Sequence, residues 1–314
     1  MLIFSVLRRG SIQFHWSAEI YGFGHCLRIF ARYPWFLPIF LTSDHGVNLS
    51  QYIDPEIKSG SFGSRVHLTW SQENTEIQIP GITIVPIQHP WLMYFENSIK
   101  VENNSRRGSI FYPLHKAPGY DFLGLDDQAS IKFLNELPGE FHPIEVSLHM
   151  HDLGGDRQKL FEDSGFKTVS LGDTNNPSFH RKFFSLVSNY KYAFSESWGS
   201  HVPFLIKSGI PTQIIPRAIT ITRQGESAPV HSSRFEIELR KAEEMFEAVP
   251  YFISSEQMLY IDKLLGVRFR KSRLEVSKIM YRELCGIGLK WILSFVIARF
   301  KLKVRQSRSN GMGI

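Results

Sequence analysis

The most constraining feature of the sequence is a regular alternation of short apolar runs with longer segments of helical spacing. The runs are rich in β-branched and aromatic residues and recur at intervals of about 20 to 24 residues. Parallel strands need crossover connections of this length, usually helices. We therefore predict a β-α-β-α-β-α-β segment with a parallel sheet. Its strands are expected in residues 144–150, 167–171, 191–195 and 212–216.

The first half of the chain has similar but less regular signals. Strand-like runs are expected at residues 37–42, 82–87 and 109–112, separated by longer loops rich in glycine and asparagine. Residues 137–143 contain two prolines and a glycine and are the best candidate for a linker. The expected fold class is α/β, with two Rossmann-like lobes built on parallel sheets.

The last part of the chain is helical in pattern and strongly basic. Residues 262–308 hold 13 lysines and arginines against three acidic residues, whereas the whole chain has a net charge of +6. A basic, partly apolar tail suits an anionic membrane surface, although a core-packing helix followed by a solvated tail gives the same pattern. We expect an N-terminal lobe at 1–140, a second lobe at 141–254 and helices with a basic tail at 255–314.

Several features indicate a protein that stays in a reducing compartment. The two cysteines, Cys26 and Cys285, form no disulfide framework and no metal or redox motif. The first ten residues lack the order of a secretory signal, and no apolar run is long enough to span a bilayer. The expected location is cytoplasmic, peripheral to the inner face of the membrane.

Residues that follow the strands of the second lobe are the first candidates for a binding site. Open parallel sheets bind ligands beyond the carboxyl ends of their strands. The turn at 195–202 joins a strand to a helix expected to begin at Ser200, so it suits an anion such as a diphosphate. An ordinary capped helix start would produce the same residues. The donor-side candidates are Asp152, Gly172, Asp173, Ser195, Glu196, Gly199, Ser200 and His201.

The first lobe supplies histidines after strands or glycine-rich turns, and a histidine can act as a base near neutral pH. Asp44 and His45 are the favoured catalytic pair, with His25 as a further candidate, although most single histidines in proteins have ordinary structural roles. Acceptor-side candidates are Gly22, Gly24, His89 and His115.

A metal site was also considered. His149 and His151 are spaced by one residue and followed by Asp152, so they can share one face of a strand. No later cluster of histidines and carboxylates completes a ligand set. We therefore expect no metal cofactor.

Four segments together resemble the GT-B-like glycosyltransferases encoded in bacterial capsule and lipopolysaccharide (O-antigen) gene clusters. They are WSAEIYGFGHCLRIFARYP at 16–34, LTSDHGV at 41–47, the stretch 159–211 and SSEQMLYIDKLLGV at 254–267. The sharpest similarity is SESWGSHVPFLIKSGIP at 195–211, which resembles the donor-site helix start of capsule-type transferases.

This resemblance implies metal-independent transfer of a sugar from a nucleotide-sugar co-substrate to a lipid-linked saccharide acceptor. It implies that the second lobe binds the donor phosphates near Ser200 and that the first lobe provides the base. Two other functions stay open: a nucleotide-sugar epimerase on the same architecture, and a non-catalytic binding or assembly protein of the same pathway. Nucleic acid is not an expected partner, because the basic residues lie in one terminal stretch rather than among aromatic residues.

Overall fold

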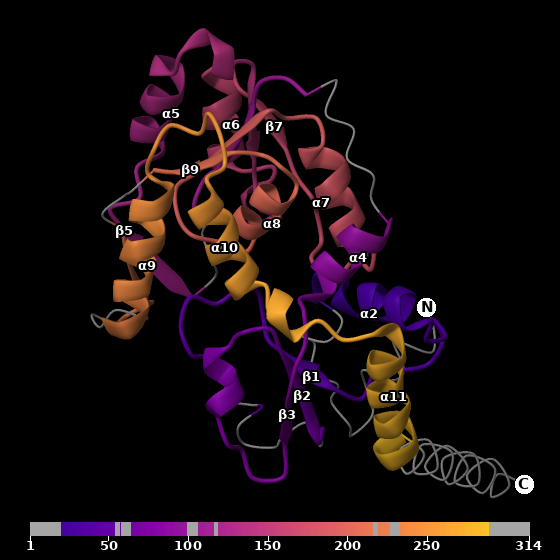
Figure 1. Cartoon of the computed structure of the whole chain (residues 1–314). Helices are drawn as coiled ribbons and strands as arrows, with labels where there is room; N and C mark the ends of the chain where they lie inside the picture. Colours follow the sequence, from indigo (N-terminus) through magenta and orange to yellow (C-terminus); the bar gives the residue numbers. More distant parts are fainter. Residues whose placement is uncertain are drawn as a thin grey trace, which may run out of the picture.

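The protein is an α/β structure with two parallel sheets, which confirms the coarse fold expected from the sequence (Figure 1). The computed structural model describes residues 20–53, 57, 64–98, 106–115, 119–215, 219–226 and 233–288. The amino-terminal 19 residues and the end of the predicted basic tail, 289–314, lie outside the described residues.

The larger sheet has five parallel strands in the order β7-β6-β4-β8-β9. The strands predicted in the second half are all present, and helices connect them as expected. The strands are β4 (Ser109–Tyr112), β6 (Ile144–Ser147), β7 (Lys167–Val169), β8 (Tyr192–Ser195) and β9 (Thr212–Ile214). The helices are α6 (Asp156–Asp163), α7 (Phe179–Val187) and α8 (His201–Lys207), with α5 (Asp127–Glu136) before β6.

Alternating side chains explain why this sheet is covered on both faces. Ile110 and Tyr112 pack in the cluster formed with α7 and α8, whereas Phe111 packs in the cluster formed with α5 and α6. Successive residues of a strand point to opposite faces, so a strand buried on both sides reads as a continuous apolar run. The two clusters therefore fix which helices lie on which face.

The smaller sheet has three parallel strands in the order β1-β2-β3. They are β1 (Thr42–Ser43), β2 (Val66–Thr69) and β3 (Thr83–Pro86). Helices α2 (Phe23–Ala31) and α4 (Pro90–Ser98) pack on each other beside it, and α2 shares an apolar cluster with β2. Strand β2 was not predicted, because its alternation of Val66 and Leu68 with polar residues covers only four positions and follows the glycine- and serine-rich stretch at 58–64. A two-stranded antiparallel sheet, β5 (Tyr120–Leu123) with β10 (Thr220–Arg223), stands apart.

Two assignments made from the sequence need correction. Strand β4 was expected in the N-terminal lobe, but it is the central strand of the larger sheet and pairs with β6 and β8. The expected linker at 137–143 is a tight connection inside the same unit, since Phe141 is fully buried and its carbonyl accepts the Ser109 hydroxyl at 2.7 Å. Pairing with distant strands decided both points. Sheet membership therefore changes before residue 109 and not at residue 140.

The C-terminal helices return the chain from the larger sheet to the smaller one (Figure 1). Helix α9 (Ser233–Phe246) is followed by α10 (Ser255–Leu264), which packs on α8, and by α11 (Arg273–Glu283), which packs on α2. Gly266 lies between α10 and α11 at φ +63°, and a Cβ there would meet the carbonyls of Trp70 and Ile87 at 2.8 Å. Only glycine fits this crossing.

A buried carboxylate organises the carboxyl edge of the smaller sheet. Asp44 lies directly after β1 and accepts hydrogen bonds from the His67 ring at 3.0 Å, the Thr69 hydroxyl at 2.5 Å, the Trp70 backbone N–H at 3.1 Å and the Asn74 amide at 2.9 Å. A charge taken out of water needs this many donors. Asp44 therefore joins β1, β2 and the turn after β2.

We expect Asp44→Asn to destabilise the protein by about 3 kcal/mol, because an amide turns one acceptor into a donor and leaves buried donors unpaired. Urea denaturation at pH 7 measures the change in the free energy of unfolding. Asp163→Asn, at an exposed position at the end of α6, is the matched control and should change it by less than about 0.5 kcal/mol. Equal stability of the two variants would contradict the structural role of Asp44.

Candidate functional site

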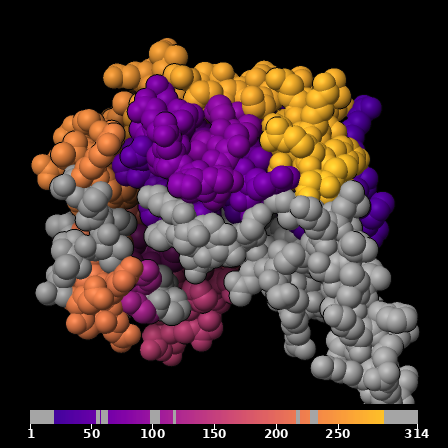
Figure 2. Space-filling model, turned by 90° about the horizontal axis from the view of Figure 1, so that it is seen from below, coloured from indigo at the N-terminus to yellow at the C-terminus, as the bar shows by residue number. Residues whose placement is uncertain are grey.

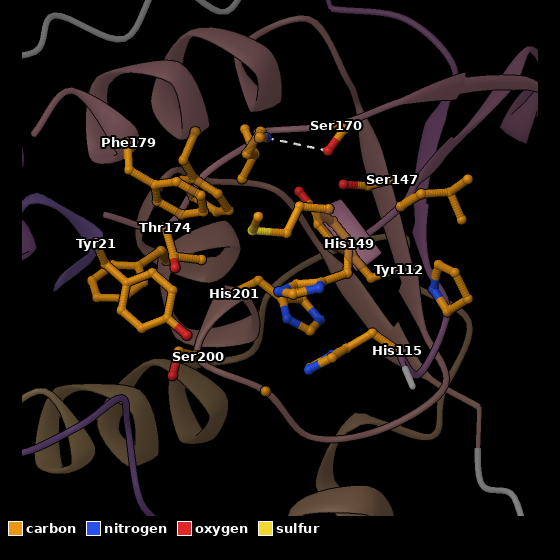
Figure 3. Close-up of a pocket in the computed structure, with 18 of the residues that line it drawn as sticks. Tyr21, Tyr112, His115, Ser147, His149, Ser170, Thr174, Phe179, Ser200 and His201 are labelled. Carbon is orange, nitrogen blue, oxygen red and sulfur yellow. Dashed lines mark hydrogen bonds between the residues drawn. The ribbon is translucent and has the colours of Figure 1, made fainter. Parts of the chain in front are cut away.

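A cavity of about 350 Å³ lies at the carboxyl ends of β4, β6, β7 and β8 (Figure 3). The loops after these strands form its polar side, and the segment that begins at Tyr21 closes it from the side of the smaller sheet. The residues that line it are Tyr21, Phe23, His89, Trp91, Tyr112, Pro113, Leu114, His115, Ser147, Leu148, His149, Met150, Ser170, Leu171, Gly172, Thr174, Phe179, Phe183, Ser197, Trp198, Gly199, Ser200, His201 and Phe204.

The loop after β4 is held by two charged groups behind the cavity. Glu196 accepts a hydrogen bond from the backbone N–H of Leu114 at 2.9 Å and another from the Ser130 hydroxyl. Arg157 donates to the carbonyl of Leu114 at 2.8 Å while it is paired with Asp127 at 2.6 Å. Both backbone groups of Leu114 are therefore fixed, and the neighbouring His115 is positioned at the mouth of the cavity.

Burial affects the charge state of Glu196. Loss of hydration raises the pKa of this carboxyl above its usual value, although the Ser130 and Leu114 hydrogen bonds and the nearby Arg157 act in the opposite direction. Asp152, which was a donor-side candidate, has a related role, because its carboxylate lies 3.3 Å from Arg157. These two acids support the site and do not line it.

Three imidazoles from two loops gather at the mouth of the cavity. The rings of His115 and His149 are stacked with centroids 4.4 Å apart, and His151 lies 4.8 Å from His149. Burial, followed by repulsion from His115 and His151, lowers the pKa of His149 to about 4. Burial and the charge of Arg157 also lower the pKa of His115. Both rings are therefore neutral at pH 7 in the free protein.

His201 forms the floor between the larger sheet and α8. Its Nε2 lies 2.8 Å from the hydroxyl oxygen of Ser195, and its ring is stacked on Tyr112 at 4.3 Å. A Cβ on Gly199 would meet this ring at 2.6 Å, so glycine is required for the turn to pass over it. Burial lowers the pKa of His201 to about 3.

The turn before α8 does not cap the helix in the way that the sequence predicted. Ser200 was expected to cap the helix, but its hydroxyl makes no capping bond and accepts the backbone N–H of Val47 at 2.9 Å. Trp198 donates its indole N–H to the Val47 carbonyl at 3.3 Å. The turn thus joins the loop after β1 to the larger sheet, while its residues still line the cavity.

The opposite side of the cavity is an aromatic wall contributed by three separate segments. Tyr21, Trp91 and Phe179 lie on it, with Trp91 4.6 Å from the ring of Phe204. Figure 3 shows Tyr21 and Phe179 on the side away from His115. The wall gives the site an apolar half facing an imidazole and hydroxyl half, which is typical of a small-molecule pocket.

His89 adds one buried polar atom to this wall. Its Nδ1 accepts the Trp91 backbone N–H at 3.0 Å, so the ring proton resides on Nε2. That Nε2 has no hydrogen-bond partner among the described residues, although the residue lines the cavity. Complete burial lowers the pKa of His89 well below its usual value. A ligand acceptor atom would satisfy this donor.

The polar half carries no fixed charge in the described part of the chain. Its polar groups are imidazoles, hydroxyls and indole N–H groups, and neither lysine, arginine, aspartate nor glutamate is among the lining residues. Within the described residues no group of histidines, cysteines and carboxylates is arranged to hold a metal ion. His149, His151 and Asp152 therefore do not form the metal site considered from the sequence.

The structure brings together six of the predicted residues and leaves the others outside the cavity. The six that line it are His89, His115, Gly172, Gly199, Ser200 and His201. Ser195, Glu196 and Asp152 support it from behind. Asp173 accepts the backbone N–H of Asn175 at 2.8 Å in a turn. Gly22 and Gly24 belong to the start of α2, where Gly22 lies against His180.

None of the three favoured catalytic residues lines the cavity. The Asp44 carboxylate is bound by the His67 ring and three other donors instead of holding His45. The ring of His45 lies 5.5 Å from Tyr21, and that of His25 lies 5.1 Å from His180. His25 lies within α2 and faces His180 of α7, whereas His45 lies in the loop after β1 behind Tyr21 of the aromatic wall.

Sequence reasoning missed Ser147, Ser170 and the aromatic wall. Ser147 is the last residue of β6 and Ser170 directly follows β7, but the predicted strands extended to 150 and 171, so the strand-end rule selected later residues. The wall carried no comparable signal, because Tyr21, Trp91 and Phe179 come from unrelated segments.

Comparison with known protein families matched no family model to this chain, and comparison with curated proteins gave no match. No helix of the described residues is long and apolar enough to cross a membrane.

The depressed histidine pKa values predict acid sensitivity. The pKa of His201 is about 3 when folded and about 6.5 when unfolded, so the unfolded chain binds the extra proton between these values. The stabilisation that comes from this pKa difference is complete above pH 6.5 and decreases as the pH falls. We expect His201→Gln to reduce the loss of unfolding free energy between pH 7 and pH 5 by up to about 2 kcal/mol. Urea denaturation at both pH values measures this, with His142→Gln as the exposed control; parallel pH dependence in all three proteins would contradict it.

Proposed function

We propose that the protein is a metal-independent glycosyltransferase of GT-B type that transfers a sugar from a nucleotide-sugar to a lipid-linked saccharide in surface polysaccharide biosynthesis. One observation carries the proposal. The cavity lies beyond the carboxyl ends of four parallel strands and is closed by the unit built on the second parallel sheet. Nucleotides bind at this edge of open α/β sheets.

The two halves of the cavity suit the two ends of such a donor. The aromatic wall at Tyr21, Trp91 and Phe179 offers faces for a planar base or the apolar face of a sugar ring. The hydroxyls of Ser147 and Ser170 offer donors and acceptors for sugar hydroxyls. A volume of about 350 Å³ is at the lower end of the range for small-molecule sites.

The diphosphate is assigned to the imidazole cluster. The Ser200 hydroxyl already accepts the backbone N–H of Val47, so the start of α8 offers fewer free groups to a phosphate than the sequence predicted. His115, His149 and His201 are the nearest groups able to become cations, because no arginine or lysine lines the described cavity. A diphosphate beside neutral imidazoles raises their pKa values and draws protons onto them.

The transfer step needs a base for the acceptor hydroxyl. In the proposed step, the acceptor oxygen bonds to the anomeric carbon, the bond from that carbon to the diphosphate oxygen breaks, and the acceptor proton moves to an imidazole. His115 is better placed for this than His45, Asp44 or His25, since it lines the cavity, and it stays neutral while His149 carries the proton that the diphosphate draws. The nucleoside diphosphate leaves with its charge met by the remaining imidazoles.

We further propose a cytoplasmic protein that works at the inner membrane surface, where its lipid-linked acceptor is held. The basic residues of 262–308 support this proposal through their attraction to anionic headgroups.

A thermal-shift screen with UDP-, GDP-, CMP- and dTDP-sugars tests donor binding. At ten times its Kd, the right donor should stabilise the folded protein by about 1.4 kcal/mol, which raises Tm by about 3 °C. His149→Ala should lose most of this shift, whereas His142→Ala, at an exposed position before β6, should keep it. No stabilisation by any of the four classes would overturn the proposal.

Turnover separates the proposed transferase from the two alternatives. Release of the nucleoside diphosphate that depends on a membrane lipid extract supports transfer. Conversion of the sugar without an acceptor identifies an epimerase. Donor binding with neither reaction identifies a binding or assembly protein, which the uncharged lining would suit.

Donor binding should also take up protons. His115, His149 and His201 are neutral at pH 7 in the free protein, with the pKa of His149 at about 4, and a bound diphosphate raises that pKa. Affinity should therefore increase as pH falls from 8 to 6, and calorimetry in buffers of different ionisation enthalpy should give net proton uptake at pH 7. His149→Gln should reduce the uptake. Affinity that is independent of pH in the unmodified protein would show that the imidazoles do not meet the phosphate charge.

A further inference from the structure

The loop between α2 and the small sheet presents two large aromatic side chains to solvent. Trp35 is 76% exposed and Phe36 is 61% exposed, and their rings meet edge to face at 5.9 Å. Exposed aromatic pairs of this kind are costly in water and usually mark a contact surface. Neither residue takes part in the cavity.

Hydrogen bonds at the base of the loop keep both side chains exposed. Arg28 donates to the carbonyl of Leu37 at 3.1 Å, and the Tyr33 hydroxyl donates to the carbonyl of Pro38 at 2.9 Å. The Leu37 backbone N–H also closes a turn onto Pro34 at 3.1 Å. Arg28 and Tyr33 are both buried, so the base of the loop is anchored while its tip stands out.

Helix α11 extends this surface. The ring of Tyr33 lies 5.0 Å from that of Tyr281 on α11. Leu274, Lys278 and Tyr281 are spaced by four and three residues, so they lie along one face of the helix. Leu274 is 63% exposed and Tyr281 is partly exposed. Figure 2 shows α11 in yellow at the molecular surface, with indigo atoms of the N-terminal segment along its edge.

The charges around these side chains are mostly positive. Arg32, Arg273 and Lys278 are exposed beside the loop and on α11. Of the acids on α11, Glu275 is used in the capping box with Ser272, and Glu283 is buried. The sequence after α11, residues 289–314, contains six lysines and arginines and no acidic residue.

We propose that the Trp35–Phe36 loop and the exposed face of α11 form a membrane-docking surface for an anionic lipid bilayer. Tryptophan and phenylalanine partition to the boundary between headgroups and acyl chains, and adjacent cations are attracted to anionic headgroups. The bilayer is the occupant that matches both properties, since the apolar tips are small and the surrounding charge is mostly positive. This surface adds a structured contact to any contribution of the basic tail, and it does not depend on the transferase proposal.

Cosedimentation of the full chain with vesicles tests the surface. We expect binding to phosphatidylcholine vesicles containing 30% phosphatidylglycerol and much weaker binding to pure phosphatidylcholine. The double variant Trp35→Ala with Phe36→Ala should lower the partition coefficient by at least about tenfold. Lys278→Gln should lower it by about fivefold on anionic vesicles only. The matched control is Phe252→Ala, which removes a phenylalanine that is 75% exposed before α10.

Each outcome decides the proposal. Loss of vesicle binding in the loop variant, with the Phe252→Ala protein unchanged and both proteins equal in Tm, supports it. Equal binding of all variants would assign membrane contact to the tail alone and overturn it. Concentration-dependent self-association that disappears in the loop variant, without vesicle binding, would also overturn it and identify a second copy as the occupant. Since no donor or acceptor is present, the result is independent of catalysis.

Discussion

Each of the two parallel sheets depends on one buried carboxylate placed directly after a strand. Asp44 follows β1 and gathers donors from β2 and the next turn, whereas Glu196 follows β8 and holds the loop after β4 through the backbone of Leu114. A carboxylate removed from water must be satisfied by several donors, so each one dictates where its neighbours lie. The spacing of the strand-end loops, and with it the shape of the cavity, follows from these two groups.

The cavity combines features that a protein interior rarely leaves together. An aromatic wall faces the neutral imidazoles of His115, His149 and His201, and the buried Nε2 of His89 has no partner among the described residues. The low pKa values of His149 and His201 follow mainly from burial, with a smaller contribution from repulsion by neighbouring imidazoles. The imidazoles of such a site can take up protons when an anion binds, and they carry no positive charge in the free protein. The affinity for the proposed donor is therefore expected to increase as the pH falls.

The parts of the fold governed by local pattern were predictable. The strands of the larger sheet were found because each is a short apolar run, and α10 and α11 begin with capping boxes at Ser254 and Ser272 that are visible in the sequence. Strand β2 was missed because its alternation covers only four residues, and the burial of His67 within it depends on the distant Asp44. The catalytic candidate His45 lies outside the cavity because a strand-end rule does not say which way a short loop turns, and His25 lies outside it because it belongs to α2 and not to a strand end.

The sequence by itself determined the α/β class, the order of strands and helices in the second half, and the concentration of basic charge toward the C-terminus. These depend on periodicity and composition, which are local properties. Tertiary structure decided that β4 joins the larger sheet, that the Ser200 hydroxyl binds Val47 and that Trp91 meets Phe204 in one wall. Contacts between residues 83 to 153 positions apart form only when separate apolar surfaces pack together, and a short stretch of sequence does not encode them.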